Sequence, residues 1–132
     1  SSVTTMQEAF AIKTDFNGDI SNRNVSSVNS MRWMFGMASA FNQDISSWNV
    51  GSVTDMGNMF DQASAFNSDI SNWDVRNVTN MRGMFKYATA FNQPLNLWNV
   101  SSITNMSFMF LGASEFNGNI SSWDVSSVTD IG

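Results

Sequence analysis

The chain repeats one motif every 25 residues, and large apolar side chains keep this spacing along its whole length. Of the 10 Met, 11 Phe and 5 Trp residues, all but Trp33, Met37 and Phe108 fall into five rows. These rows are Met6, Met31, Met56, Met81 and Met106; Met34, Met59, Met84 and Met109; Phe10, Phe35, Phe60, Phe85 and Phe110; Phe16, Phe41, Phe66, Phe91 and Phe116; and Trp48, Trp73, Trp98 and Trp123. A fixed period of this length is typical of repeat proteins, in which neighbouring units stack and bury a shared core.

The third repeat shows what one unit is expected to build. Its structural core rows are predicted to be Met56, Met59, Phe60, Phe66, Asn67, Ile70, Trp73, Val75 and Val78. Met56, Met59 and Phe60, together with Ala63, have the i, i+3, i+4, i+7 spacing of one helix face. Asp69, Ile70 and Ser71 are expected to form a very short strand with Ile70 facing inward.

The sequence therefore predicts an α/β solenoid. It would be a leucine-rich-repeat-like, right-handed stack of about five 25-residue coils, each with a short helix and a very short parallel strand. One repeat domain would occupy residues 1–132, with coils at approximately 4–28, 29–53, 54–78, 79–103 and 104–128. Residues 1–4 and 126–129 read Ser-Ser-Val-Thr at the same phase of the motif, so we expect a fragment of a longer array.

The composition argues against several classes of function. The chain has no Cys and no His, so thiolate chemistry and the commonest general base are both missing. Its net charge is −5 and its six basic residues form no run, which disfavours nucleic acid as a partner. No apolar stretch is long enough to insert into a membrane. We expect no catalytic residue, cofactor or metal site, and no enzymatic activity.

Two further rows leave alternatives open. The Asn row, which consists of Asn17, Asn42, Asn67, Asn92 and Asn117, is expected to be structural, because buried turn backbone requires hydrogen-bond partners. The Trp row is expected to fill the core, although an exposed ladder of indoles could stack on sugar rings.

Acidic residues suggest a weaker possibility of calcium binding. Asp15, Asn17 and Asp19 resemble the start of a calcium loop, but no Glu closes it. Asp19, Asp44 and Asp69 form a short carboxylate row whose members would repel and raise each other's pKa. Solvated surface carboxylates are the favoured interpretation.

Specificity in a repeat protein is expected where the coils differ. The varied positions of the predicted helices include exposed apolar residues that the framework does not require. The candidate partner-binding residues are Ile12, Trp33, Met37, Tyr87, Phe108 and Leu111. They could contact a partner, or they could pack against flanking coils of a longer array or against another copy of the chain; partner contact and homotypic contact have about equal weight.

The segment Ala65 to Val75, followed by Val78-Thr79-Asn80-Met81 and Met84-Phe85, resembles the motif of the BspA-like leucine-rich-repeat surface proteins. The mycoplasma-type surface-lipoprotein branch, with its 25-residue repeat, is the most similar. The resemblance implies a secreted or surface-anchored array with an α/β solenoid fold, and adhesion to host or matrix components. It implies no catalytic residues.

The leading functional expectation is a non-enzymatic extracellular or cell-surface module for adhesion or protein recognition. Its partner would be a protein or matrix component, with homotypic contact as a further possibility. The alternative is a structural spacer in a large surface protein, without a ligand of its own. A calcium- or carbohydrate-binding module is the weaker alternative.

Overall fold

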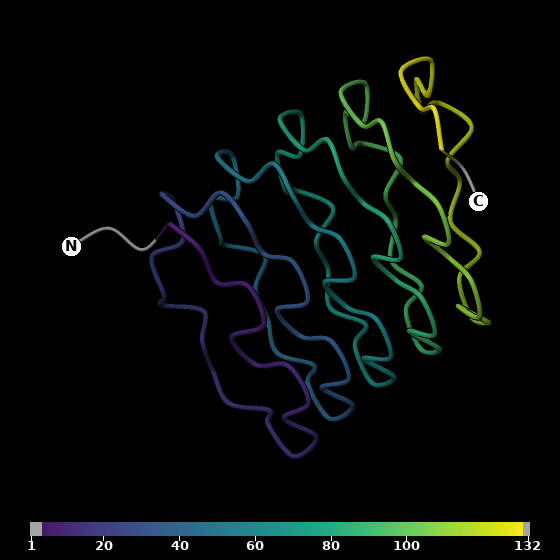
Figure 1. Cartoon of the computed structure of the whole chain (residues 1–132). Helices are drawn as coiled ribbons and strands as arrows, with labels where there is room; N and C mark the ends of the chain where they lie inside the picture. The colour runs from purple at the N-terminus through teal and green to yellow at the C-terminus, as the bar shows by residue number, and fades with distance from the viewer. Residues whose placement is uncertain (1–3, 131–132) are drawn as a thin grey trace.

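The computed structural model describes residues 4–130, which run as a row of flattened coils stacked side by side from the N-terminus to the C-terminus (Figure 1). Residues 1–3 and 131–132 lie outside this range, so the comparison of the two chain ends falls partly outside the described residues. Within residues 4–130 there is no helix and no extended strand. The β-structure consists of five isolated parallel bridges: Thr5–Ser30, Ser30–Asp55, Asp55–Asn80, Asn80–Asn105 and Asn105–Asp130.

The predicted helix is wrong, because a series of tight turns takes its place. These turn segments span 7–12, 32–37, 57–62, 82–87 and 107–112. In the third coil, alternate amides donate to the carbonyl three residues back: Met59 to Met56, Asp61 to Asn58 and Ala63 to Phe60, at 3.0–3.2 Å. The amides between them donate to the next coil: Asn58 to Arg82, Phe60 to Met84 and Gln62 to Lys86, at 2.7–2.9 Å.

The turn segments place apolar residues at i, i+3, i+4 and i+7 on one side, as a helix would. Asn58 and Gln62 both have positive φ angles, of 55° and 61°, so the backbone conformation recurs after four residues. Side chains at i, i+3, i+4 and i+7 therefore reach one side here as well. Packed helices need about 8–10 Å between axes, whereas Phe60 lies only 5.5 Å from Phe35 and 5.8 Å from Phe85, centroid to centroid. Coils stacked this closely have no room for helices.

The predicted strand is also wrong. Residues 66–70 have no regular secondary structure, and the coil-to-coil bridge forms at Asp55 instead. There the Asp55 carboxylate accepts the Gly57 amide at 2.8 Å and the Asn80 side-chain amide at 3.0 Å. Ile70 nevertheless faces inward and is fully buried. These findings overturn the leucine-rich-repeat-like α/β solenoid, with its helix and strand in each coil.

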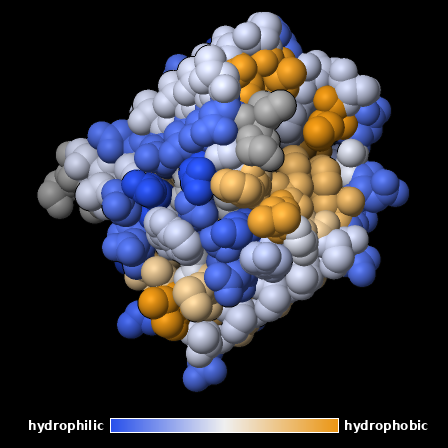
Figure 2. Space-filling view, turned by 45° about the vertical axis from the view of Figure 1, so that its right-hand side comes forward, coloured by the Kyte–Doolittle hydropathy of each residue, from blue (hydrophilic) through white to orange (hydrophobic). Residues whose placement is uncertain are grey.

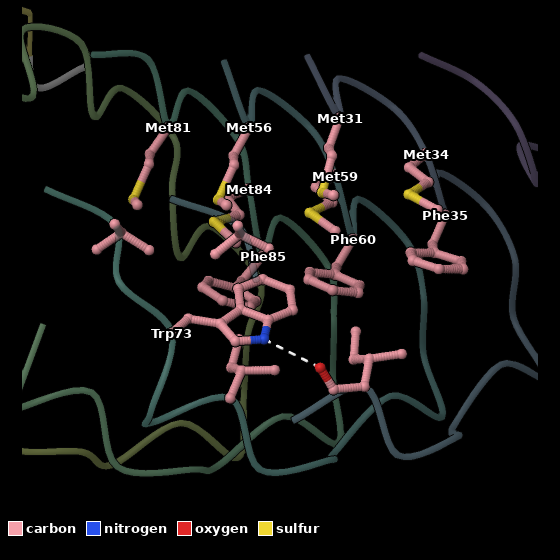
Figure 3. Close-up of a cluster of buried hydrophobic side chains, with 14 of the residues drawn as sticks. Met31, Met34, Phe35, Met56, Met59, Phe60, Trp73, Met81, Met84 and Phe85 are labelled. Carbon is pink, nitrogen blue, oxygen red and sulfur yellow. Dashed lines mark hydrogen bonds between the residues drawn. The ribbon is translucent and has the colours of Figure 1, made fainter. Parts of the chain in front are cut away.

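The apolar rows meet in one continuous core between the coils (Figure 3). Eight of the nine predicted core positions of the third repeat are buried: Met56, Met59, Phe60, Phe66, Ile70, Trp73, Val75 and Val78. The ninth, Asn67, is exposed and joins neighbouring coils instead of filling the core. The first Phe row stacks nearly parallel along the whole molecule, with neighbouring ring centroids 5.4–5.8 Å apart. Burial of each such side chain stabilises the fold by roughly 1.5–3 kcal/mol. Each coil completes the core of its neighbour.

The Asn row joins the coils on another side of the stack. Each Asn side-chain oxygen accepts the backbone amide of the Asn one coil later, and all four bonds measure 2.8 Å: Asn42 to Asn17, Asn67 to Asn42, Asn92 to Asn67 and Asn117 to Asn92. The side chains are exposed at their outer edge. The structural interpretation of this row is supported by these bonds.

Candidate functional site

The residues that differ most between coils lie on one surface, which we call the variable face. It comprises the first, second, fifth and sixth residue of every turn segment. The third and fourth residues belong to the core rows, except for Ala9 in the first segment, which is exposed. In chain order its members are Gln7, Glu8, Ala11 and Ile12; Arg32, Trp33, Gly36 and Met37; Gly57, Asn58, Asp61 and Gln62; Arg82, Gly83, Lys86 and Tyr87; and Ser107, Phe108, Leu111 and Gly112. No position of this face carries the same residue in all five coils.

The second and sixth residues of every turn segment have positive φ. The ten residues are Glu8, Ile12, Trp33, Met37, Asn58, Gln62, Gly83, Tyr87, Phe108 and Gly112, with φ between 55° and 71°. This left-handed conformation costs a residue with a Cβ about 1–2 kcal/mol, and glycine or asparagine tolerates it best. Ile12 is the most strained, because β-branched residues rarely adopt it.

All six candidate partner-binding residues lie on the variable face. Trp33 is half-buried, and the other five, Ile12, Met37, Tyr87, Phe108 and Leu111, are exposed. Two of the rings lie against glycine backbone, since a Cβ added at Gly36 would overlap the Trp33 ring and one at Gly112 would overlap the Tyr87 ring. The glycines therefore make room for aromatic side chains to lie flat. Whether these residues bind a partner stays a prediction.

Two cations and two aromatic rings form a group that we call the basic–aromatic cluster: Arg82, Lys86, Tyr87 and Phe108. The Arg82 guanidinium carbon lies 4.9 Å from the Phe108 ring centroid, and Arg82 also donates to the Ser107 hydroxyl at 3.1 Å. The Lys86 ammonium lies 5.8 Å from both ring centroids. Within the described part of the chain, neither cation has a carboxylate oxygen within 4.0 Å.

A buried polar pair lies one coil earlier on the same face. Asp61 is 2% exposed and Asn58 is 8% exposed, and the Asn58 amide donates to one Asp61 oxygen at 2.9 Å. The other Asp61 oxygen has no hydrogen-bond partner. Burial raises the pKa of Asp61, an effect that the bond from Asn58 and the charge of Lys86 partly oppose.

The pKa values of the carboxylate row are set mainly by hydrogen bonds from serines. Ser21, through its backbone amide and then its hydroxyl, lowers the pKa of Asp19. The pKa values of Asp44 and Asp69 are lowered mainly by serine hydroxyls two residues later. The Asp44 charge does raise the pKa of both Asp19 and Asp69, as expected, but this repulsion is smaller than the lowering by the serine hydrogen bonds. Residues 4–130 contain no group of three or more Asp, Glu, His or Cys side chains that could hold a metal ion.

The Trp row belongs to the core. Trp48, Trp73 and Trp98 are 3–4% exposed, and the indole N–H of each donates to a carbonyl of the preceding coil at 3.0–3.2 Å. In Figure 3 this bond joins Trp73 to the Ile45 carbonyl. Indoles enclosed in this way present no face to a sugar ring, which removes the basis for a carbohydrate ladder at these three positions.

The last coil presents core-row side chains at the C-terminal end of the stack. A hollow of about 640 Å³ lies there, lined by Met106, Phe108, Met109, Phe110, Leu111, Ile120, Ser121, Trp123 and Val125. Figure 2, in which this end is turned forward, shows apolar side chains gathered over it. Most of these residues occupy rows that pack against a following coil elsewhere in the stack, so the hollow follows from the packing pattern of the repeat.

Sequence reasoning identified the two rings of the basic–aromatic cluster, Tyr87 and Phe108, but missed its two cations and the buried pair. Arg82 and Lys86 form no charge run, but they are four residues apart, which is the interval after which the backbone conformation recurs. That spacing could have placed them together. No sequence signal marks the burial of Asn58 and Asp61, which depends on how neighbouring coils cover them.

Comparison with known proteins identifies the family but no curated relative. A family model described as "Mycoplasma protein of unknown function, DUF285" matches residues 1–77 and residues 49–132, which together span the chain. No curated protein and no solved structure matches the chain. Among residues 4–130, no helix has the length and apolar character needed to cross a bilayer. The family match agrees with the mycoplasma-type part of the resemblance but carries no leucine-rich-repeat assignment. The chain belongs to the DUF285 family of Mycoplasma-type repeat proteins.

Proposed function

We propose that this chain is a non-enzymatic recognition module of a secreted or cell-surface protein, and that its variable face contacts a protein or matrix partner. The single observation that carries the proposal is the presence of bulky residues at positive φ. Glycine occupies these positions as Gly83 and Gly112, and asparagine does so as Asn58. The turn architecture is therefore compatible with the residues that adopt the conformation at least cost.

Large apolar residues stand at the same positions in other coils despite a cost of about 1–2 kcal/mol each. They are Ile12, Trp33, Met37, Tyr87 and Phe108. Their side chains are half-buried or exposed, so they contribute less to the core than the Met and Phe rows do. Strain retained where folding does not require it is a reason to look for function. Binding of a partner accounts for such side chains.

The residues outside the variable face change little from coil to coil, and this supports the variable face as the binding surface. The Asn row, the apolar rows and the paired carbonyls serve coil-to-coil contact, and they recur with little change. A surface that differs from coil to coil can distinguish one partner from another, whereas a uniform surface repeats the same contacts. The variable face is thus the best candidate for specificity.

The proposal is tested with the double variant Trp33→Gly/Met37→Gly. Glycine suits the positive φ at both positions, so the fold should persist while the apolar side chains are removed. Leu97→Ser is the matched control, because Leu97 is exposed, apolar and outside the variable face. Purified protein is applied to immobilised extracellular-matrix proteins and glycans, and its sedimentation is measured alone.

We expect the wild type and the control to bind at least one matrix protein, and the double variant to lose most of this binding. No binding by the wild type would favour the structural spacer. Equal binding by all three proteins would place the contact elsewhere. A wild-type dimer that the double variant abolishes would assign the face to contact between copies of the chain.

A further inference from the structure

We infer that the basic–aromatic cluster of Arg82, Lys86, Tyr87 and Phe108 is the subsite that receives an acidic segment of the protein partner, pairing its carboxylates with the two cations. This inference rests on the proposed function and specifies the chemistry of the ligand. The segment would carry Asp or Glu together with an apolar side chain. The argument uses charge, geometry and exposure in turn.

The charge distribution is uneven. The chain as a whole carries −5, yet the variable face holds three of the six basic residues: Arg32, Arg82 and Lys86. Arg76, by comparison, pairs with Asp74 at 3.2 Å. Among residues 4–130, neither Arg82 nor Lys86 has a carboxylate oxygen within 4.0 Å. The charge of Lys86 acts on the Asp61 carboxylate only from beyond that distance, so both cations can pair with carboxylates from another molecule.

The geometry places both cations around one ring. Arg82 and Lys86 belong to one turn segment and are four residues apart, while Phe108 comes from the next coil. The two charged groups lie 4.9 Å and 5.8 Å from the Phe108 centroid. Contacts of this kind are worth about 0.5–1 kcal/mol at exposed sites. They position the cations without neutralising their charge.

The rings supply the apolar part of the subsite. Phe108 is 41% exposed, and the neighbouring Leu111 and Tyr87 are exposed to a similar extent. An aliphatic or aromatic side chain of the ligand can pack on them while nearby carboxylates reach Arg82 and Lys86. This combination fits an acidic peptide with apolar residues better than a purely polar ligand.

An extended polyanion is a poorer match. Nucleic acids and sulfated glycans are bound along a continuous basic track, whereas this cluster is isolated on an acidic chain. The positions equivalent to Lys86 are Asp61 in the coil before and Leu111 in the coil after. The positive charge therefore does not extend into the neighbouring coils along this row. A short acidic segment needs only the two cations.

The test uses a short fluorescein-labelled peptide of alternating Glu and Leu, and the same peptide with Gln in place of Glu. Binding to the full chain is followed by fluorescence anisotropy. Arg82→Gln and Lys86→Gln are compared with Arg76→Gln, which removes the same charge from a site outside the variable face. Phe108→Gly removes the ring while keeping a residue suited to the positive φ of 59°.

We expect the Glu peptide to bind more tightly than the Gln peptide, and added salt to weaken it. Arg82→Gln and Lys86→Gln should each raise the dissociation constant about fivefold, as expected for an exposed ion pair of about 1 kcal/mol. Phe108→Gly should also weaken binding, and Arg76→Gln should leave it unchanged. A heparin fragment and single-stranded DNA should bind less tightly than the Glu peptide.

The inference is overturned if the Glu peptide does not bind, if the Glu and Gln peptides bind equally, or if Arg76→Gln has the same effect as the cluster variants. Tighter binding of the heparin fragment or the DNA would reassign the subsite to a polyanion. Matrix-protein binding that depends on Trp33 and Met37 but survives both cluster substitutions would leave the proposed function standing without this subsite.

Discussion

Replacing Ile12 with glycine tests the strain on which the proposed function depends. Ile12 has φ of 61° and is 67% exposed, so its side chain keeps only a minor share of its area in contact with the protein. Glycine removes a left-handed penalty of about 1–2 kcal/mol, with the upper value expected for a β-branched residue. Against this stand the greater freedom of glycine in the unfolded chain, about 0.4–1 kcal/mol, and the lost contacts, about 0.5–1 kcal/mol.

These contributions nearly cancel for Ile12→Gly, so its free energy of unfolding should equal or slightly exceed that of the wild type. Leu97→Gly is the matched comparison, because Leu97 is 75% exposed and is not among the positive-φ residues. Leu97→Gly incurs the same two losses, the added freedom of the unfolded chain and the lost contacts, but relieves no left-handed penalty. It should destabilise the protein by about 1–2 kcal/mol. The difference between the two variants isolates the left-handed penalty of about 1–2 kcal/mol.

The assay is urea denaturation followed by the fluorescence of the buried tryptophans, with the slope of the transition compared among the three proteins. A difference of this size also separates the midpoints of thermal unfolding by roughly 3–8 °C. If Ile12→Gly destabilises the chain as much as Leu97→Gly does, these positions carry no strain. The retention of bulky residues on the variable face would then need no functional explanation.

Three further predictions concern the polar contacts. Because burial raises the pKa of Asp61 above its ordinary value of 3.8, the contribution of Asp61 to the free energy of unfolding should fall as pH rises through the raised pKa. Asp61→Asn should remove this fall and be more stable than the wild type at about pH 7, with a smaller advantage near pH 4, as measured by urea titration at both values. Trp73→Phe leaves the buried Ile45 carbonyl without its donor and should cost about 2–3 kcal/mol, measured by thermal unfolding. Asn67→Ala removes the acceptor of the Asn92 amide at an edge that water can reach, so denaturation should show a loss of only about 1 kcal/mol.

Much of the candidate site could be located from the sequence, because variation between repeats is visible without coordinates. Trp33, Met37 and Phe108 break the pattern of apolar rows, and they lie on the variable face with the other candidates. Arg82 was not singled out, because its significance depends on a ring from the next coil. Asp61 was also missed, because its burial depends on neighbours that the sequence does not place beside it.

The 25-residue period by itself determined which side chains meet. Met59, Phe66 and Trp73 recur at that interval, and burying such rows requires neighbouring repeats to stack in register. It also determined which positions are free to vary. These properties follow from spacing and polarity alone, whatever backbone conformation connects the residues.

Only the tertiary structure decided the backbone conformation within a coil. An interval of i, i+3, i+4 and i+7 suits a helix, but it suits equally a chain of turns with positive φ every fourth residue, as at Asn58 and Gln62. The choice depends on the distance to the next coil, where Phe60 and Phe85 lie 5.8 Å apart. At that spacing, alternate backbone amides donate hydrogen bonds to carbonyls of the next coil. In a helix these amides would bond to carbonyls of the same coil, so turns replace helices.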